Sequence, residues 1–175
     1  DMRRGVTMHQ RIARVPWAVR GLALFGISAL VLAAFWTAAS AAPPPATRTF
    51  TMAAVEPKGG ATVDTEPFPR DPLPEGKGYV LKEPDPKTGR WEVSTYRWDP
   101  SQIVVYQGDT VVLEILGVNG DVHPARIEGY VSGFVVRRGH LTRLTFTADK
   151  AGFFKIECTT HQPSMVGTLV VLPRQ

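Results

Sequence analysis

The stretch from Gly152 to Leu172, GFFKIECTTHQPSMVGTLVVL, consists of two apolar runs separated by a short polar loop. The runs GFFKIEC and VGTLVVL are rich in β-branched and aromatic residues, a composition typical of strands. The loop follows Cys158, the one cysteine of the chain, and it carries a histidine three residues on and a methionine four further. The stretch therefore predicts a strand-loop-strand unit that brings a thiol, an imidazole and a thioether close together.

The same pattern continues through residues 89–175. Short runs rich in Val, Ile, Thr and aromatic residues are separated by turn signals such as QGD at 107–109 and NGD at 119–121. Residues 141–146 alternate between apolar and polar side chains, and no apolar stripe with the helical period of 3.6 residues reaches helical length. We therefore expect an all-β fold over residues 89–175, a Greek-key β-sandwich of about seven or eight strands.

Two different segments precede this domain. Residues 43–88 hold most of the 15 prolines and show little periodicity, which predicts a Pro-rich linker or arm. Within it, Tyr79-Val80-Leu81 is a candidate for a short edge strand. Residues 1–20 form a basic flank with five arginines, and residues 21–42 contain no charged side chain.

The uncharged run at 21–42 predicts one N-terminal hydrophobic helix. At 1.5 Å per residue it would cover about 33 Å, enough for a hydrocarbon core of about 30 Å. A retained transmembrane anchor in the cytoplasmic membrane is the first expectation, with the basic flank in the cytoplasm and the C-terminal domain facing the periplasm or outside. The sequence Ala39-Ser40-Ala41 also fits a signal-peptide cleavage site, so a soluble periplasmic protein cleaved at about Ala41 is the alternative.

The distribution of charge argues against a nucleic-acid partner. The formal net charge of +4 is carried by residues 1–42, whereas residues 43–175 hold equal numbers of basic and acidic side chains. No lysine-rich stripe or RNA-binding signature lies in that second part. The basic flank therefore indicates membrane orientation rather than nucleic-acid binding.

The ligand types around the loop are those of a copper site. A soft thiolate, two imidazoles and a weak thioether suit copper in electron transfer. Cys158, His161 and Met165 come from the loop itself, and His123 is the best candidate for the fourth ligand because it follows a strand-like run and a turn. The other two histidines lie in the basic flank and in an RRGH turn. Structural zinc generally needs four strong N or S ligands, and this set has only three.

Several of these motifs together resemble the cupredoxin superfamily. They are DPSQIVV at 99–105, QGD at 107–109, VH at 122–123, FTADKAG at 146–152 and residues 158–171. Within the superfamily they look most like the copper domain of nitrous-oxide reductase and of the single-anchor subunit II of haem-copper oxidases. Those dinuclear domains carry two cysteines in the order C-x3-C-x3-H-x2-M, whereas this loop reads C-x2-H-x3-M. The second bridging thiolate is absent, and the loop resembles that of the small blue-copper carriers.

The resemblance implies one mononuclear copper ion that transfers single electrons. The implied ligand roles are Cys158 as strong thiolate, His123 and His161 as equatorial imidazoles, and Met165 as weak axial ligand. Such a site has no open position for a substrate, so the module would have no catalytic site of its own. Expected partners are a transient redox protein or the other subunits of a membrane oxidoreductase. Two alternatives stay open, a copper-binding or delivery protein without redox turnover and a copper-free structural subunit.

Residues beside the histidines bear on how a partner would dock. Small apolar side chains next to both predicted histidine ligands indicate an apolar surface around an exposed imidazole edge, where a small transient interface fits. These residues are Pro124, Pro163 and Val166. Tyr96 and Trp98 resemble the aromatic residues through which electrons enter subunit II. Because they occupy alternate positions of one strand-like run, however, we expect Trp98 to lie in the core.

Overall fold

The structure is a computed structural model that describes residues 43–174, and these residues form twelve strands and no helix. The all-β prediction is therefore confirmed for this part of the chain. The predicted hydrophobic helix at 21–42 and the basic flank lie outside the described residues. Within residues 43–174 no helix has the length and apolar character needed to cross a bilayer.

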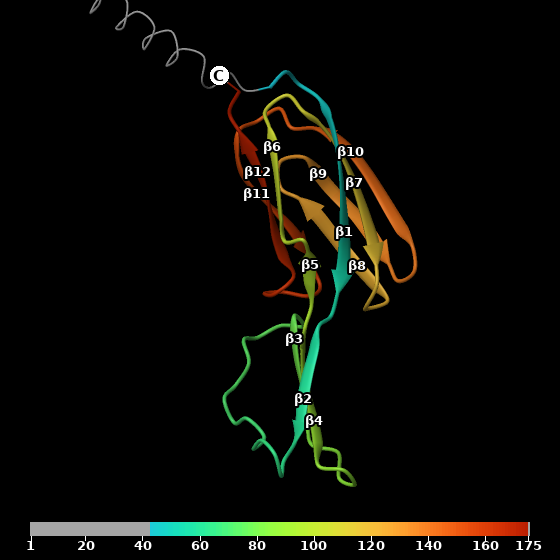
Figure 1. Ribbon diagram of the computed structural model, residues 1–175, viewed down its shortest axis with the longest axis vertical. Coiled ribbons are helices and arrows are strands. Elements are labelled where there is room, and N and C mark those ends of the chain that lie inside the picture. Colours follow the sequence, from blue (N-terminus) through green and yellow to red (C-terminus); the bar gives the residue numbers. More distant parts are fainter. Residues whose placement is uncertain (1–42, 175) are drawn as a thin grey trace, which may run out of the picture. The chain divides into compact units, whose positions relative to one another are not determined.

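Two sheets lie face to face as a β-sandwich (Figure 1). The four-stranded sheet has the order β10 (Leu141–Thr147), β7 (Thr110–Gly117), β1 (Thr47–Val55) and β5 (Arg97–Asp99). The five-stranded sheet has the order β6 (Gln102–Tyr106), β12 (Val166–Leu172), β11 (Gly152–Cys158), β8 (Val122–Ile127) and β9 (Val131–Arg137). After β5 the chain passes repeatedly from one sheet to the other, so neighbours in sequence often lie in different layers.

Alternation along the strands builds the core between these sheets. In β7 every second side chain is buried, and Val111, Leu113 and Ile115 all point inward. They meet inward residues of the opposite sheet such as Ile156 and Leu169 in one apolar cluster. Burying such side chains is worth about 1.5 to 3 kcal/mol each relative to leaving them in water. Trp98 is fully buried in the same cluster, which confirms its predicted core position.

The structure corrects the predicted boundary at residue 89. Residues 47–55, expected to belong to a linker or arm, form β1 in the middle of the four-stranded sheet. This strand pairs in parallel with β7, from Thr47 opposite Thr110 to Ala54 opposite Gly117. Met52 and Ala54 of β1 are buried in the core. The sequence TRTFTMAAV alternates, but its small residues and the prolines around it obscured the strand signal.

The rest of the predicted linker, together with β4, forms a projection that we call the arm, residues 56–96. Its three-stranded antiparallel sheet has the order β2 (Lys58–Thr62), β4 (Arg90–Thr95) and β3 (Tyr79–Lys82), at the lower end of Figure 1. The predicted edge strand at Tyr79-Val80-Leu81 is therefore confirmed, although it pairs within the arm rather than with the sandwich. Trp91 holds the proline-rich loop against this sheet, because its ring meets Phe68 edge-on and its indole N–H donates to the carbonyl of Glu66.

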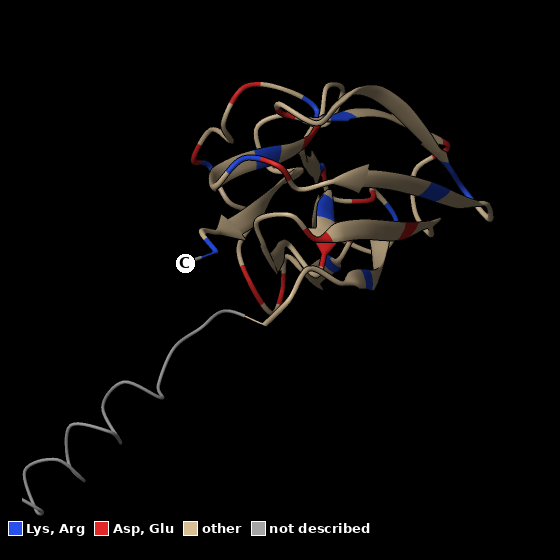
Figure 2. Cartoon of the chain, turned by 90° about the horizontal axis from the view of Figure 1, so that it is seen from above, with Lys and Arg blue, Asp and Glu red and all other residues tan. Residues whose placement is uncertain are grey.

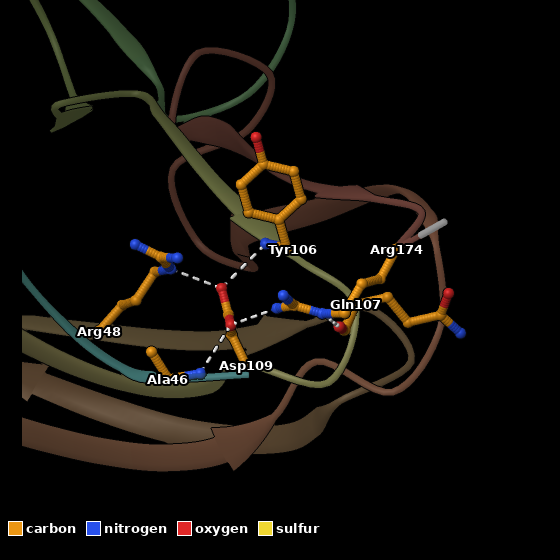
Figure 3. Close-up of polar contacts among 6 residues, drawn as sticks. All are labelled: Ala46, Arg48, Tyr106, Gln107, Asp109 and Arg174. Atoms are coloured by element: carbon orange, nitrogen blue, oxygen red, sulfur yellow. Dashed lines mark hydrogen bonds and ion pairs between the residues drawn. The ribbon is translucent and has the colours of Figure 1, made fainter. Parts of the chain in front are cut away.

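The opposite end of the sandwich is fastened by a buried carboxylate (Figure 3). Asp109 Oδ1 accepts hydrogen bonds from Ala46 N at 3.0 Å and from Arg174 at 2.6 Å. Its Oδ2 accepts from Arg48 Nε at 2.5 Å and from Tyr106 N at 3.0 Å. These five residues, which we call the Asp109 cluster, join the start of β1 and the C-terminal end of the described chain to one turn.

This arrangement strongly favours the ionised carboxylate. Burial alone would raise the pKa of Asp109, but the hydrogen bonds from Arg48 and from the backbone N–H groups of Tyr106 and Ala46 lower it to about 2, from 3.8. A buried carboxylate held by two guanidinium groups is a strong, directional fastening. Elsewhere Lys and Arg are interspersed with Asp and Glu (Figure 2), as in the pairs Arg143–Glu114 and Arg126–Glu157.

Candidate metal centre

Two adjacent strands bring His123 and Cys158 to the same end of the five-stranded sheet. Cys158 is the last residue of β11, and it lies opposite Ala125 of the antiparallel neighbour β8. His123 is two residues before Ala125, so both side chains point to the inner face of the sheet. The backbone N–H of Thr159 donates to the carbonyl of Pro124 at 2.8 Å, which keeps the start of the following loop against β8.

The ligand loop, residues 159–165, then folds back over this pair. Cys158 N donates to the carbonyl of Met165 at 3.0 Å, and Met165 N donates to the carbonyl of His161 at 3.0 Å. The side-chain amide of Gln162 donates to the carbonyl of Cys158 at 2.6 Å. These bonds close the loop on itself, so that His161 is directed toward the two strands. Met165, the last residue of the loop, is fully buried.

The three donor atoms converge. The Nδ1 atoms of His123 and His161 are 3.1 Å apart, and Cys158 Sγ is 3.3 Å from His161 Nδ1. All three ligand atoms lie within 4.8 Å of one another. Cys158 and His123 are fully buried, and His161 is 9% exposed. We call these three residues the His-Cys-His group.

Asn119 fixes the orientation of the His123 ring. His123 Nε2 lies 2.7 Å from the carbonyl oxygen of Asn119, which can only accept, so Nε2 carries the proton and Nδ1 presents its lone pair to the group. Asn119 is itself held by its backbone N–H, which donates to Ala54, and by its side-chain oxygen, which accepts from the N–H of Glu56. The end of β1 thus supports the imidazole indirectly.

The local environment keeps the thiol and the imidazole uncharged. Burial raises the pKa of the Cys158 thiol, against the backbone N–H groups of His161 and Thr160, which lower it. Burial also lowers the pKa of His161, and repulsion from His123 acts in the same direction. A metal ion that binds here therefore displaces the proton of the thiol, whereas the imidazole of His161 is already neutral, as a metal ligand must be.

The donor set fits a thiophilic metal ion. An ion bound about 2.0 Å from nitrogen and about 2.3 Å from sulfur holds such atoms at most about 4 Å apart. The separations of 3.1 and 3.3 Å satisfy that limit, and all three ligand atoms lie within 4.8 Å of one another. Two imidazole nitrogens and a thiolate suit copper, and the buried position excludes bulk water. The structure therefore contains a preformed three-donor site.

The structure brings together three of the four predicted ligands. Met165 follows them in the closed loop, and its role as weak axial ligand stays a prediction. His140, which the sequence placed in a surface turn, is exposed there. The expected exposed imidazole edge is not found, because the ring of Tyr96 stacks on His161 with centroids 3.9 Å apart. Only the position of Tyr96 two residues before Trp98 hinted at this contact in the sequence.

Comparisons with known proteins concern the fold. No protein-family model and no curated protein matches the chain. Similar solved structures include a haem-copper terminal oxidase dimer, with 19% identity over 43% of this chain and 56% of that chain and a TM-score of 0.39. The multicopper oxidase mgLAC has 16% identity over 74% of this chain and 40% of that chain, with a TM-score of 0.45.

A third similar structure is auracyanin A, a blue copper protein from the green thermophilic photosynthetic bacterium Chloroflexus aurantiacus. It has 21% identity over 43% of this chain and 88% of that chain, with a TM-score of 0.38. The chain thus spans little more than half the length of the oxidase chain and two fifths of mgLAC. The β-sandwich and its His-Cys-His group are consistent with a cupredoxin-like fold, as the resemblance of the ligand loop suggested.

Proposed function

We propose that this protein binds one copper ion in a mononuclear site and carries single electrons. His123 Nδ1, His161 Nδ1 and Cys158 Sγ are the strong ligands, and Met165 is the weak axial one. A bound copper ion supplies one-electron redox chemistry, since this mixture of soft and borderline donors accommodates both Cu(I) and Cu(II). The chain contributes the fixed positions of the donors and the exclusion of water.

One observation carries the proposal, the convergence of three lone-pair donors in a buried site whose imidazole tautomer is set by Asn119. Buried polar atoms are normally paired with donors of the same chain. Here the polar atoms are paired only with one another, and a cation that replaces the thiol proton would bind all three at once. A single thiolate cannot bridge two ions as two cysteines do, so the proposal is for one ion.

The proposal extends to the setting of the domain. The basic flank and the uncharged run at 21–42 support an exported protein anchored in the cytoplasmic membrane, with the sandwich facing the periplasm or outside. Cleavage at about Ala41, which would give a soluble periplasmic protein, is the alternative. A transient redox protein or the subunits of a membrane oxidoreductase would exchange electrons with the site. Mass measurement of the mature chain decides between anchor and cleaved leader.

Copper titration of the full chain in detergent tests the central claim. We expect one equivalent of Cu(II) to produce an intense thiolate-to-copper charge-transfer band that disappears on reduction and returns on reoxidation. His123→Ala weakens binding and alters the band, whereas His140→Ala, in an exposed turn, leaves both unchanged. Two internal coppers, preferential retention of zinc, or bound copper that cannot be cycled would each contradict the proposal.

A further inference from the structure

The arm is fastened directly to the ligand loop by Gly78. The backbone N–H of Gly78 donates to the carbonyl of Gln162 at 2.8 Å. Its carbonyl accepts two hydrogen bonds, from Tyr96 N at 2.8 Å and from Ser164 Oγ at 2.8 Å. Both polar groups of this one peptide residue are therefore used to join the arm to the loop.

The fit at Gly78 leaves no room for a side chain. A Cβ atom there would lie 2.4 Å from Ser164 Oγ and 2.8 Å from the carbonyl oxygen of His161. Gly76 is equally close, since its Cβ would lie 2.2 Å from the carbonyl oxygen of Gln162. Contacts below about 3 Å force atoms to move, so both glycines permit an approach that other residues would prevent.

Ser164 and Tyr96 complete the junction from the two sides. Ser164 Oγ also lies 2.8 Å from the carbonyl of Tyr96, so one hydroxyl serves two carbonyl oxygens. Tyr96 is the last residue of the arm, directly before β5, and its ring stacks on that of His161 at an angle of 29° between the ring planes. The same ring meets His123 edge-on, with centroids 5.8 Å apart. Tyr96 thus contacts both imidazoles of the His-Cys-His group.

We propose that the arm is a clamp that holds the metal-binding loop closed in the metal-free protein. Gly78 and Ser164 hold the backbone of the loop, and Tyr96 holds the ring of His161; all three are positioning residues. A clamp matters here because the three ligand side chains are buried and crowded, with donor atoms 3.1 and 3.3 Å apart and no cation to hold them in place. Fixing ligands on a supported loop reduces the rearrangement that binding requires. The identity of the metal rests on the proposed function, whereas the clamp does not.

The thiol of Cys158 reports directly on opening of the clamp. It is the one cysteine in the chain and is fully buried, so a disulfide reagent reaches it only when the loop opens. The metal-free full chain in detergent is mixed with an aromatic disulfide, which releases one coloured thiolate for each thiol modified. Ser164→Ala is expected to accelerate the reaction by roughly 2- to 12-fold, the effect of one hydrogen bond. The matched control is Ser132→Ala, at an exposed strand position.

Two further pairs of variants separate the parts of the clamp. Tyr96→Leu is expected to accelerate the reaction roughly 2- to 12-fold through loss of the stacked ring, and Tyr96→Phe, which keeps the ring, restores a slow rate. Gly78→Ala is expected to give the largest acceleration. Gly133→Ala is its control, because a Cβ there meets no atom within 4 Å. If Gly78→Ala does not fold, the Ser164 and Tyr96 variants carry the test.

The dependence of the rate on denaturant distinguishes local opening from global unfolding. The clamp predicts that the thiol reacts faster than the global unfolding equilibrium allows, at a rate that changes little with low denaturant concentrations, whereas each variant lowers the unfolding midpoint only by the free energy of the contact removed. The proposal is overturned if the variants react within about twofold of their controls, or if their rates follow global unfolding alone. It is also overturned if the parent thiol reacts as fast as in the unfolded chain. Failure of copper binding with an intact clamp would count only against the proposed function.

Discussion

Each end of the sandwich buries a polar cluster that joins distant segments of the chain. The two clusters differ in the hydrogen-bond partners that the chain supplies to them. At the Asp109 cluster each carboxylate oxygen accepts two hydrogen bonds, one from a guanidinium and one from a backbone N–H. At the His-Cys-His group the three potential ligand atoms contact one another instead, at 3.1 and 3.3 Å. Charge and donors from the chain complete the first cluster. The atoms of the second cluster are the N and S ligands that copper prefers, which is why function is expected there.

The largest effect is expected from Cys158→Ser. A hydroxyl cannot replace the covalent copper-sulfur bond, so the intense charge-transfer band should vanish and copper affinity should fall by at least about a hundredfold. The free energy of unfolding of the metal-free protein should change by only about 1 kcal/mol. Absorption spectra and denaturant titrations measure the two quantities. An unchanged spectrum would refute the role of the thiol.

The converse experiment disrupts the Asp109 cluster at the opposite end of the sandwich. Asp109→Asn leaves two arginines without their counter-charge, so the free energy of unfolding should fall by about 3 kcal/mol while the copper spectrum stays the same. Asp64→Asn, at an exposed turn, is the control and should have almost no effect. A change in the spectrum on Asp109→Asn would show that the two ends are coupled.

Acid should affect the Asp109 cluster selectively. Because the folded pKa of Asp109 is about 2 and its ordinary value is 3.8, the unfolded chain binds the proton more readily. The stabilisation of about 2 kcal/mol is complete above about pH 5 and is lost as the pH falls through 4 toward 2. Denaturant midpoints at pH 6 and pH 3 should therefore differ less in Asp109→Asn than in the parent. Equal acid sensitivity in both would contradict the assignment.

The smallest effect is expected from Met165→Leu. Leucine keeps the apolar volume and removes the weak thioether, so the colour should survive, the potential should rise, and stability should change by less than about 1.5 kcal/mol. Met52→Leu makes the same exchange in the buried part of β1 and should leave the potential unchanged. Loss of copper from Met165→Leu would mean that the thioether is a principal ligand.

The sequence predicted those parts of the molecule whose signals are local. Apart from the three-residue β5, the strands after residue 89 are five to eight residues long, and several are bounded by turn tripeptides. The strands β11 and β12 are predicted from the loop between them. The convergence of Cys158 and His161 follows from three residues of spacing at the end of a strand. Choosing His123 required only that it lie at the same end of an adjacent strand.

What the sequence did not predict depends on contacts between distant segments. β1 is a strand because β7, more than fifty residues later, offers it a parallel partner, and its own composition is ambiguous. The arm covers His161 because Gly76 and Gly78 fit closely against the ligand loop, which lies about eighty residues later in the sequence. Neither pairing leaves a periodic signal in the residues themselves. The exposed imidazole edge was therefore expected where the arm now lies.

The course of β1 sets a distance between attachment and chemistry. The strand begins beside Ala46 in the Asp109 cluster and ends where Ala54 and Glu56 hold Asn119, the support of His123. Its nine residues span about 26 Å at 3.3 Å per step. The ligand atoms of the His-Cys-His group therefore lie at the end of the sandwich opposite residue 43, about the length of the sandwich away from it. Under the proposed function, an electron-exchange partner would have to reach the distal end, beside the arm, and its height above a membrane shared with this protein would be a criterion for recognising it.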